Sequence, residues 1–193
     1  ADELFALGIR DDELHRIAGS IGSDVPFFLI GGTAYATGRG ENLAPLDPVT
    51  PVPLLLLLPK ERVATPAAYR ALADRRQRLR IAGGIPRGLD TIRAAAGGGI
   101  RTLCAEMTND LEDPVFEMVP SLRRWKARLI EEGAIASLMS GSGSTIFGVF
   151  EDVALRNRAA ERLGAEIPVV RTEPVQRQRA GTPSASHALN TGR

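Results

Sequence analysis

Residues 137–150, SLMSGSGSTIFGVF, consist of two apolar runs separated by five small residues. The apolar runs predict two strands, and residues 140–144 predict the loop that joins them. Glycines allow a loop to adopt positive φ angles, and its free N–H groups, together with serine hydroxyls, are able to bind an anion. Two hypotheses therefore remain for this loop: a plain hairpin turn, or a loop that binds a phosphate. Because no Gly-Lys-Ser/Thr is present, it is not a Walker A loop.

The segments around this hairpin alternate between strand and helix patterns. Upstream, Leu54–Leu58 is an apolar run between two prolines, too short for an independent helix, and it predicts a buried strand. Residues 152–164 predict a helix and residues 166–174 a final strand. Further helices are predicted from about residue 66, near 89–93, over 100–107 and from 113, with a kink or restart at Pro120. Residues 52–171 therefore predict an α+β domain.

A second group of elements is predicted before residue 50. Residues 11–21 have the apolar spacing of one helix face, with Asp11 or Asp12 as the cap and Gly22 as the end. Residues 33–46 alternate around Gly-Arg-Gly and predict a hairpin. A helix and one hairpin bury little apolar surface, so this group is not expected to be stable alone.

A single carboxylate, Asp24, lies between a Gly-Ser break and an apolar run in IGSDVPFFLIGG, residues 21–32. Pro26 suits the first turn of a short helix with Val25 as its cap, and residues 27–29 are expected to anchor that helix in a core. The Asp24 side chain is then not used for capping. It is either a general base beside a buried site or a loop aspartate that accepts hydrogen bonds from nearby backbone N–H groups.

Composition argues against several classes of function. The chain has 24 Lys and Arg against 23 Asp and Glu, so we expect no nucleic-acid partner and no membrane partner. Residues 75–80, RRQRLR, are interpreted as a solvated helix face. The lone Cys104 excludes an internal disulfide, and with no signal-peptide pattern we expect a cytoplasmic location. His15 and His187 are far apart in the sequence, and we predict no metal site.

Four segments, in the same order and at similar spacing, resemble motifs of the 4-diphosphocytidyl-2-C-methyl-D-erythritol kinases, which are GHMP kinases. They are IGSDVPFFLIGGTAYATGRGENLAPL (21–46), VATPAAYRAL (63–72), TNDLEDPV (108–115) and LMSGSGSTIFGVF (138–150). The resemblance covers residues 10–170. It implies an α+β GHMP kinase fold with a partial ribosomal-S5-like N-terminal portion over 1–50 and a ferredoxin-like C-terminal domain over 51–172. Composition predicts a disordered tail over 173–193.

The resemblance also implies an activity, the ATP-dependent phosphorylation of the 2-hydroxyl of 4-diphosphocytidyl-2-C-methyl-D-erythritol in non-mevalonate isoprenoid biosynthesis. ATP is then the co-substrate, bound with Mg²⁺. Asp24 matches the catalytic aspartate, Tyr69 the aromatic residue that stacks on cytosine, and Thr65 a position beside the substrate. The glycine loop near the phosphates is matched by Ser140, Gly141, Ser142 and Gly143. A half-buried aromatic side chain on a helix is the alternative for Tyr69.

The sequence departs from the family pattern at its start. A lysine near the chain start and the main phosphate loop, P-x-x-x-G-L-G-G-G-S-S-D-A-A, are absent from residues 1–193, and AAAGGGIRT at 94–102 lies in the wrong part of the family order. We therefore expect little or no kinase activity from these residues alone, and self-association through exposed edges of residues 1–50. Two alternatives stay open: a non-catalytic remnant that at most binds the cytidine moiety, and a GHMP kinase for homoserine, mevalonate or a sugar.

Overall fold

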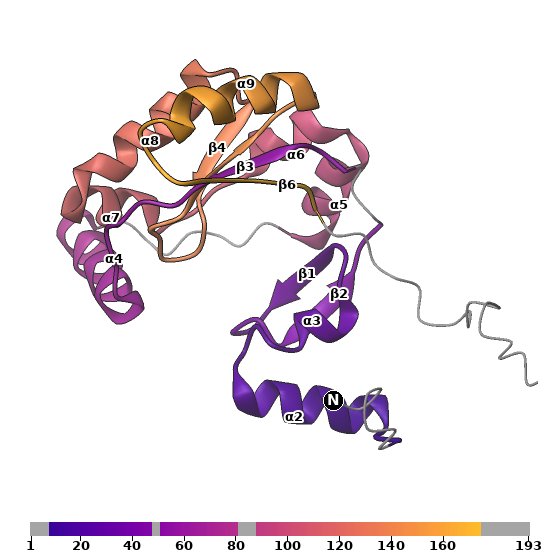
Figure 1. The fold of residues 1–193 in the computed structure, drawn as a ribbon. Coiled ribbons are helices and arrows are strands. Elements are labelled where there is room, and N and C mark those ends of the chain that lie inside the picture. The colour runs from indigo at the N-terminus through magenta and orange to yellow at the C-terminus, as the bar shows by residue number, and fades with distance from the viewer. Residues whose placement is uncertain (1–7, 48–50, 81–87, 175–193) are drawn as a thin grey trace, which may run out of the picture. The chain divides into compact units, whose positions relative to one another are not determined.

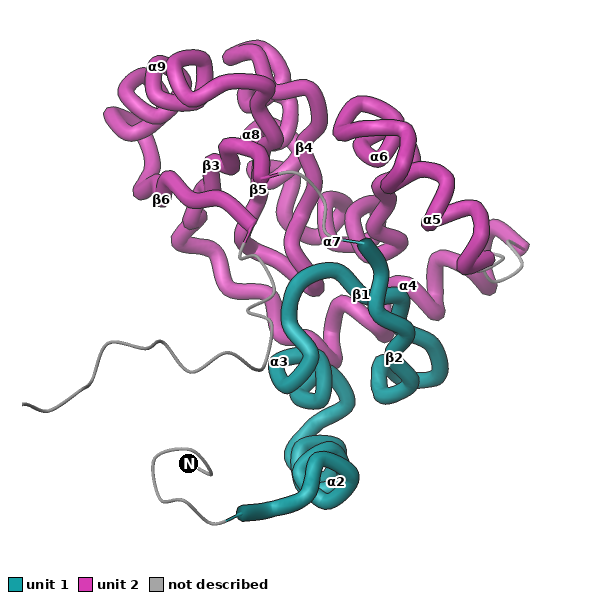
Figure 2. The backbone as a smooth tube through the Cα atoms, turned by 90° about the vertical axis from the view of Figure 1, so that its right-hand side faces the viewer, with its two compact units in different colours: residues 1–48, 176–193 teal, residues 49–175 magenta. Residues whose placement is uncertain are grey.

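The computed structural model describes residues 8–47, 51–80 and 88–174, and Figure 1 shows the elements that they form. These residues fall into two compact units: unit 1 lies within residues 1–48 and unit 2 within residues 49–175 (Figure 2). Of the tail predicted over 173–193, all but the first two residues lie outside the described ranges. No helix in the described ranges is long and apolar enough to cross a membrane.

Unit 2 is built on a four-stranded antiparallel sheet with the order β4–β5–β3–β6. The strands are β3 (Leu54–Leu57), β4 (Ala136–Met139), β5 (Ile146–Val149) and β6 (Val169–Thr172). Leu57 pairs with Ile146 on one side and with Val169 on the other, so β3 is a central strand. Helices connect β3 to β4 and β5 to β6, which gives the β-α-β-β-α-β connectivity of a ferredoxin-like domain.

Helices cover both faces of this sheet. The helices of unit 2 are α4 (Thr65–Leu79), α5 (Leu89–Gly97), α6 (Ile100–Glu106), α7 (Glu112–Met118), α8 (Pro120–Glu131) and α9 (Val153–Gly164). Helix α8 packs on β4 and β5, and α9 packs on β3 and β6, both on one face of the sheet (Figure 1). Helix α6 contributes Cys104 to the cluster on the other face. Helix α4 packs against α7, and α7 against α8. The predicted restart at Pro120 is confirmed, because α8 begins there.

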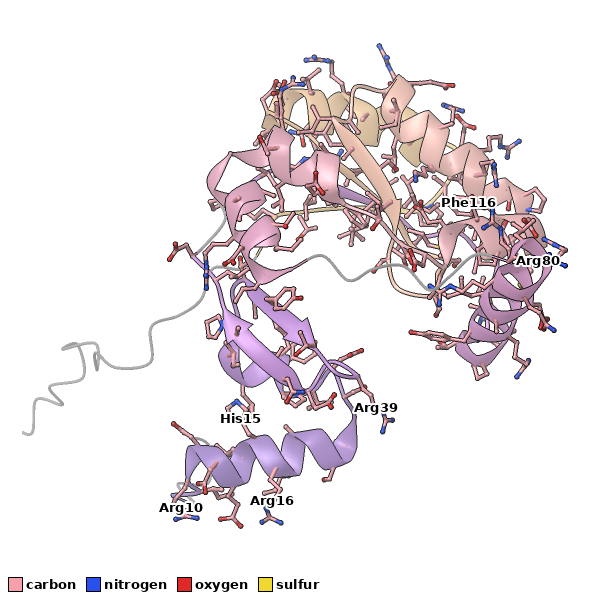
Figure 3. The ribbon with its side chains drawn as sticks, turned by 180° about the vertical axis from the view of Figure 1, so that it is seen from behind. Arg10, His15, Arg16, Arg39, Arg80 and Phe116 are labelled. Carbon is pink, nitrogen blue, oxygen red and sulfur yellow. The ribbon has the colours of Figure 1, made fainter. Side chains whose placement is uncertain are left out.

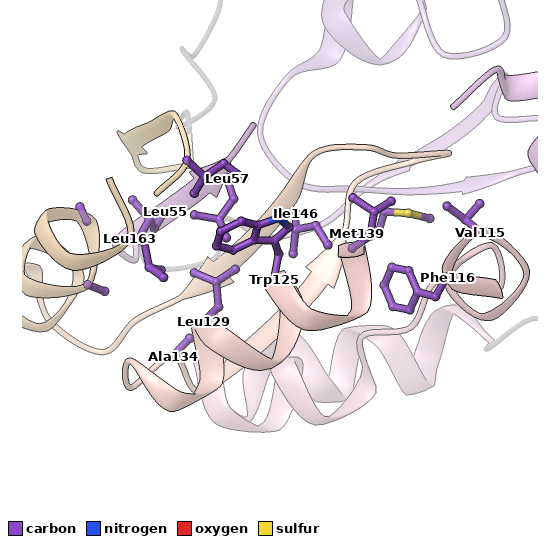
Figure 4. Close-up of a cluster of buried hydrophobic side chains, with 14 of the residues drawn as sticks. Leu55, Leu57, Val115, Phe116, Trp125, Leu129, Ala134, Met139, Ile146 and Leu163 are labelled. Atoms are coloured by element: carbon purple, nitrogen blue, oxygen red, sulfur yellow. The ribbon is translucent and has the colours of Figure 1, made fainter. Parts of the chain in front are cut away.

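The alternation of side chains along β3 explains why both faces are apolar. Leu55 and Leu57 are fully buried in the main core with Leu129 of α8 and Leu163 of α9 (Figure 4). Leu54 belongs to a second cluster on the other face, which includes Val52, Cys104, Ala136 and Val149. The all-leucine run is therefore a strand covered on both sides, as its length predicted.

Unit 1 contains α2 (Asp11–Ile21), α3 (Phe27–Ile30) and an antiparallel hairpin of β1 (Ala34–Thr37) and β2 (Asn42–Pro45). The predicted helix, short helix and hairpin are confirmed. The cap of α2 is different, because Arg10 occupies the N-cap position and no side chain caps the helix. Along α2, Arg10 pairs with Asp12 and Arg16 with Glu13. Figure 3 labels the two arginines.

Two predictions about the short helix α3 were wrong. Its N-cap is Pro26 and not Val25, because the preceding turn uses i→i+3 hydrogen bonds, including Val25 N–H to Gly22 O at 3.2 Å. Phe28 and Leu29 do not anchor the helix in a core, since Phe28 is 78% exposed and Leu29 is 45% exposed. A four-residue helix presents few inward positions, and Pro26 is the buried residue instead.

Candidate functional site

The loop between β4 and β5 is a tight turn closed by its own backbone. The N–H of Ser140 donates to the carbonyl of Thr145 at 2.9 Å, and the N–H of Gly143 donates to the carbonyl of Ser140 at 3.0 Å. Gly141 and Gly143 have φ angles of 56° and 85°, in the region that favours glycine. A Cβ atom on Gly143 would lie 2.8 Å from the sulfur of buried Met139. The predicted strand, glycine loop and strand are therefore confirmed, and Gly143 is needed for close packing as well as for its φ angle.

Helix α4 brings two other predicted site residues to this loop. Thr65 is the first residue of α4, and its hydroxyl lies 2.8 Å from the hydroxyl of Ser142. Tyr69 follows one helical turn later, on the same face of α4 as Thr65. The Tyr69 side chain is 59% exposed, which argues against its alternative role as a half-buried packing residue. Unit 2 thus gathers Thr65, Tyr69 and residues 140–143 in one region.

Positive side chains border the same loop. A cavity of about 750 Å³ is lined by Gly143, Ser144 and Thr145 together with residues 58–63 and Pro168. Lys60 and Arg62 contribute positive charge, and neither forms an ion pair with another described residue. The hydroxyl of Ser121 donates to Glu61 at 2.6 Å, and this hydrogen bond lowers the pKa of the Glu61 carboxyl. The hydroxyl of Ser144 donates to the carbonyl of Pro59 at 3.3 Å, which joins the two segments.

Asp24 lies in unit 1, in the turn before α3. The side chain is exposed, and its Oδ1 atom lies 2.8 Å from the position that a Cβ atom on Gly40 would occupy. Its backbone carbonyl accepts the N–H of Phe27 at 3.3 Å, while its carboxylate accepts no hydrogen bond within the described residues. The hypothesis of a loop aspartate held by backbone N–H groups therefore finds no support. The carboxylate is available to solvent or to a ligand.

Sequence reasoning missed two residues that hold the glycine loop. The side-chain amide of Asn109 donates to the carbonyls of Met139 and Gly141, each at 2.8 Å. Glu112 accepts the N–H of Met139 at 2.7 Å. Both residues lie in TNDLEDPV, a motif of the resemblance that assigns neither residue a role. A polar residue near a helix start has many ordinary uses, so their role was visible only once β4 was placed beside α7.

The described residues contain no cluster of three or more His, Cys, Asp or Glu side chains arranged to bind a metal ion. Cys104 is a free thiol on α6, and burial raises the pKa of its thiol. Cys104 is buried in the second cluster with Val52, Ala136 and Val149.

Comparison with known proteins shows which proteins the chain is similar to. The sequence profile described as GHMP kinases C terminal matches residues 91–169. The chain is 38% identical over 172 residues to the 4-diphosphocytidyl-2-C-methyl-D-erythritol kinase of Synechococcus sp. (strain JA-3-3Ab), covering 88% of this chain and 56% of the relative. It is 40% identical over 166 residues to the enzyme of that name from Moorella thermoacetica (strain ATCC 39073 / JCM 9320), covering 86% and 57%.

A solved structure agrees with these sequence relatives. The crystal structure of a 4-(cytidine 5'-diphospho)-2C-methyl-D-erythritol kinase matches with a TM-score of 0.72 and 35% identity, covering 89% of this chain and 59% of that chain. The ferredoxin-like sheet and these matches together show the fold of the GHMP kinases. Among the GHMP kinases, the chain is similar to the 4-diphosphocytidyl-2-C-methyl-D-erythritol kinases, and it spans a little over half of their length.

Proposed function

We propose that these 193 residues belong to an ATP-dependent kinase that phosphorylates the 2-hydroxyl of 4-diphosphocytidyl-2-C-methyl-D-erythritol. The observation that carries this proposal is the grouping of Thr65, exposed Tyr69 and the Ser142 loop in a chain 38–40% identical to two kinases of that name. Since the chain spans just over half of those relatives, the activity of the whole protein is part of the proposal.

Phosphoryl transfer requires mainly positioning and charge neutralisation from the protein. In our proposal, Asp24 accepts the proton of the substrate's 2-hydroxyl as its oxygen bonds to the γ-phosphorus of ATP. The bond between that phosphorus and the β,γ-bridging oxygen breaks, and ADP leaves. The exposed carboxylate of Asp24, which no described N–H group occupies, is suited to this role.

In our proposal, the substrate's cytosine stacks on the ring of Tyr69. A flat, exposed ring on a helix supplies a stacking surface for a base, and Thr65 lies one turn away to contact the same ligand. The N–H groups of Gly141 and Ser142 donate to no described carbonyl, and we assign them, with the cations Lys60 and Arg62, to the neutralisation of phosphate charge. ATP enters with Mg²⁺, and the main phosphate loop of the family does not lie within residues 1–193.

Several finer assignments belong to the same proposal. Residues 1–50 form part of the N-terminal domain and residues 51–172 form the C-terminal domain. A cytoplasmic location agrees with the free Cys104. Self-association of the isolated chain is supported by the exposed apolar side chains of Ile21 and Phe28 in unit 1.

Two other functions remain as competitors. A non-catalytic chain would bind cytidine nucleotides without turning over ATP. A GHMP kinase for homoserine, mevalonate or a sugar would have no cytosine to stack, so the exposed Tyr69 favours the cytidine-linked substrate. Competition by CMP separates the cytidine-linked substrate from the other kinase substrates, because only a site for a cytidine-linked ligand loses that ligand to CMP. Turnover of ATP separates the kinase from the non-catalytic chain.

The experiment is an ADP-release assay with the cytidine-linked substrate. It is run on the 193-residue chain and on the same chain placed behind the N-terminal segment of the Synechococcus relative. We expect little or no turnover from the first protein and clear turnover from the second, with Asp24→Asn reducing the rate at least about a hundredfold, as loss of a general base does. An inactive fusion that still binds CMP would favour the non-catalytic chain. Equal rates for the fusion and its Asp24→Asn variant would show that Asp24 is not the general base.

A further inference from the structure

The side chain of Asn109 is fully used by the backbone around the glycine loop. Its amide group donates to two carbonyls, those of Met139 and Gly141, and its Oδ1 atom accepts the N–H of Leu111 at 2.9 Å. An asparagine amide has two N–H donors and one carbonyl acceptor, so each of these groups has a partner. Only one orientation of the amide satisfies all three contacts, because the flipped amide would direct its oxygen at two carbonyls.

Glu112 holds the same strand end by binding the N–H group of Met139. Its Oε1 atom accepts the N–H of Met139 at 2.7 Å, and its Oε2 atom pairs with the ammonium group of Lys126 at 2.5 Å. The Glu112 side chain is 13% exposed, so this contact is shielded from water. The N–H and the carbonyl of Met139, the last residue of β4, are therefore both bound by side chains of one short segment.

The same segment also fixes helix α4. Asp110 pairs with Arg76 at 2.6 Å, and Asp113 pairs with Arg75 at 2.8 Å. Residues 109–113 thus contact the helix that carries Thr65 and Tyr69 as well as the loop that carries Ser142. These contacts hold the two elements that the Thr65–Ser142 hydrogen bond joins, and that bond depends on the position of both.

We propose that Asn109 is a positioning residue of the acceptor site, which fixes the conformation of the Ser140–Gly143 loop and so holds the Ser142 hydroxyl beside Thr65. This inference rests on the proposed function for the identity of the ligand, and on the hydrogen bonds alone for the loop. Loss of the two amide donors leaves the carbonyls of Met139 and Gly141 without this partner, and the loop is then held mainly by its own turn.

Asn109→Asp is the sharpest variant. It keeps the size of the side chain and an oxygen for the N–H of Leu111, and it replaces the NH₂ group with an oxygen that faces two carbonyls. Asn157→Asp makes the same chemical change on α9 and is the matched control. Among the described residues, the Asn157 side chain forms a hydrogen bond only with the neighbouring Arg156. Asn109→Ala serves as a second variant that adds no charge.

The measurement is amide hydrogen exchange by NMR on the full 193-residue chain, followed by titration with CMP. We expect exchange at Ser140 and Gly143, whose N–H groups donate to carbonyls of the loop, to become at least about tenfold faster in Asn109→Asp, with exchange in α9 unchanged, as local opening requires. The CMP dissociation constant should rise at least about fivefold, because a mobile loop must be ordered on binding. Asn157→Asp should change neither quantity.

Unchanged exchange in the loop of a folded Asn109→Asp protein would overturn the proposal. An increase spread evenly over α9 and the loop, or failure of both Asn109 variants to fold, would also overturn it, because Asn109 would then serve the stability of the whole unit. If the wild-type chain fails to bind CMP, the proposed cytidine ligand is wrong, while the exchange of the loop amides still decides the role of Asn109.

Discussion

The hydroxyl groups of Thr65 and Ser142 lie 2.8 Å apart, although 77 residues separate them in the chain. Thr65 opens helix α4, and Ser142 lies between the two positive-φ glycines of the loop after β4. This hydrogen bond connects the helix that presents Tyr69 to the loop assigned to phosphate. A ligand that stacks on Tyr69 and places a phosphate at the loop would therefore meet two elements already held together.

Thr65→Val tests the strength of that connection, because valine keeps the shape of threonine and removes the hydroxyl. We expect a loss of about 0.5–1.5 kcal/mol in the free energy of unfolding, the usual net value of one hydrogen bond. Urea unfolding of Thr65→Val, Ser142→Ala and the double variant measures it. The double variant should lose less than the sum of the two single losses. Strictly additive losses would mean that the two hydroxyls do not interact in solution.

Gly143→Ala should destabilise unit 2 more than Gly141→Ala does. Both substitutions place a side chain at a positive φ angle, which costs about 1–2 kcal/mol. Only at Gly143 does the new Cβ atom also meet the buried sulfur of Met139 at 2.8 Å, whereas Gly141 has no heavy atom within 4 Å of that position. The additional overpacking should cost about 1–3 kcal/mol.

Urea unfolding of the two glycine variants, side by side, checks this difference. A third protein with Gly143→Ala and Met139→Ala provides space for the new methyl group. It should show a smaller effect of the glycine change than the protein with Met139 intact. Equal unfolding energies for Gly141→Ala and Gly143→Ala would show that the loop moves away from Met139 at little cost.

Local patterns predicted most of the elements, because their signals lie within a few residues. Prolines 53 and 59 bracket β3, Pro120 begins α8, and glycines 141 and 143 shape the loop. The order of the strands was not predictable from periodicity, since β3 pairs with β5 and β6 across about ninety residues or more, and pairing at that distance leaves no local pattern. The exposure of Phe28 was mispredicted for a related reason: an apolar run shows a preference for burial but not what covers it.

The candidate site was predictable only in part. Asp24, Thr65 and Tyr69 were found through a resemblance spread over most of the chain, whereas each was ambiguous alone. The contacts of Asn109 depend on two carbonyls about thirty residues away, and nothing in a local pattern marks which carbonyls need a donor. Long-range polar contacts are the part of a site that requires the fold.

The ion pairs between α4 and α7 predict how stability depends on pH. Arg78 and Arg75 donate to Glu117, and these hydrogen bonds lower the pKa of the Glu117 carboxyl below its ordinary value of 4.5. A lowered pKa in the folded chain contributes stability above the unfolded pKa, and this contribution is lost as the pH falls through the folded value. We therefore expect Glu117→Gln to be less stable than the wild type at neutral pH and to lose less stability on acidification.

Urea midpoints at neutral pH and in acid, for the wild type and Glu117→Gln, measure this dependence. Glu161→Gln removes the same charge from α9, where Glu161 forms no ion pair with another described residue, and is the control. Because Glu117 is exposed, high salt should reduce the difference between the wild type and Glu117→Gln at neutral pH. A difference that grows on acidification would contradict the assigned direction of the pKa shift.

Tyr69 provides the most direct test of the ligand. Stacking of a base on an aromatic ring contributes about 1–3 kcal/mol, so Tyr69→Ala should raise the CMP dissociation constant about 5- to 150-fold. Tyr69→Phe keeps the ring and should bind within about twofold of the wild type, since the stacking surface is unchanged. The side chain is 59% exposed, so neither variant should change the free energy of unfolding by more than about 0.5 kcal/mol. Calorimetric titration of the folded variants with CMP measures these affinities. Equal affinities of wild type and Tyr69→Ala would mean that the cytosine binds elsewhere. An equal loss of affinity in Tyr69→Phe would assign the effect to the hydroxyl and not to stacking.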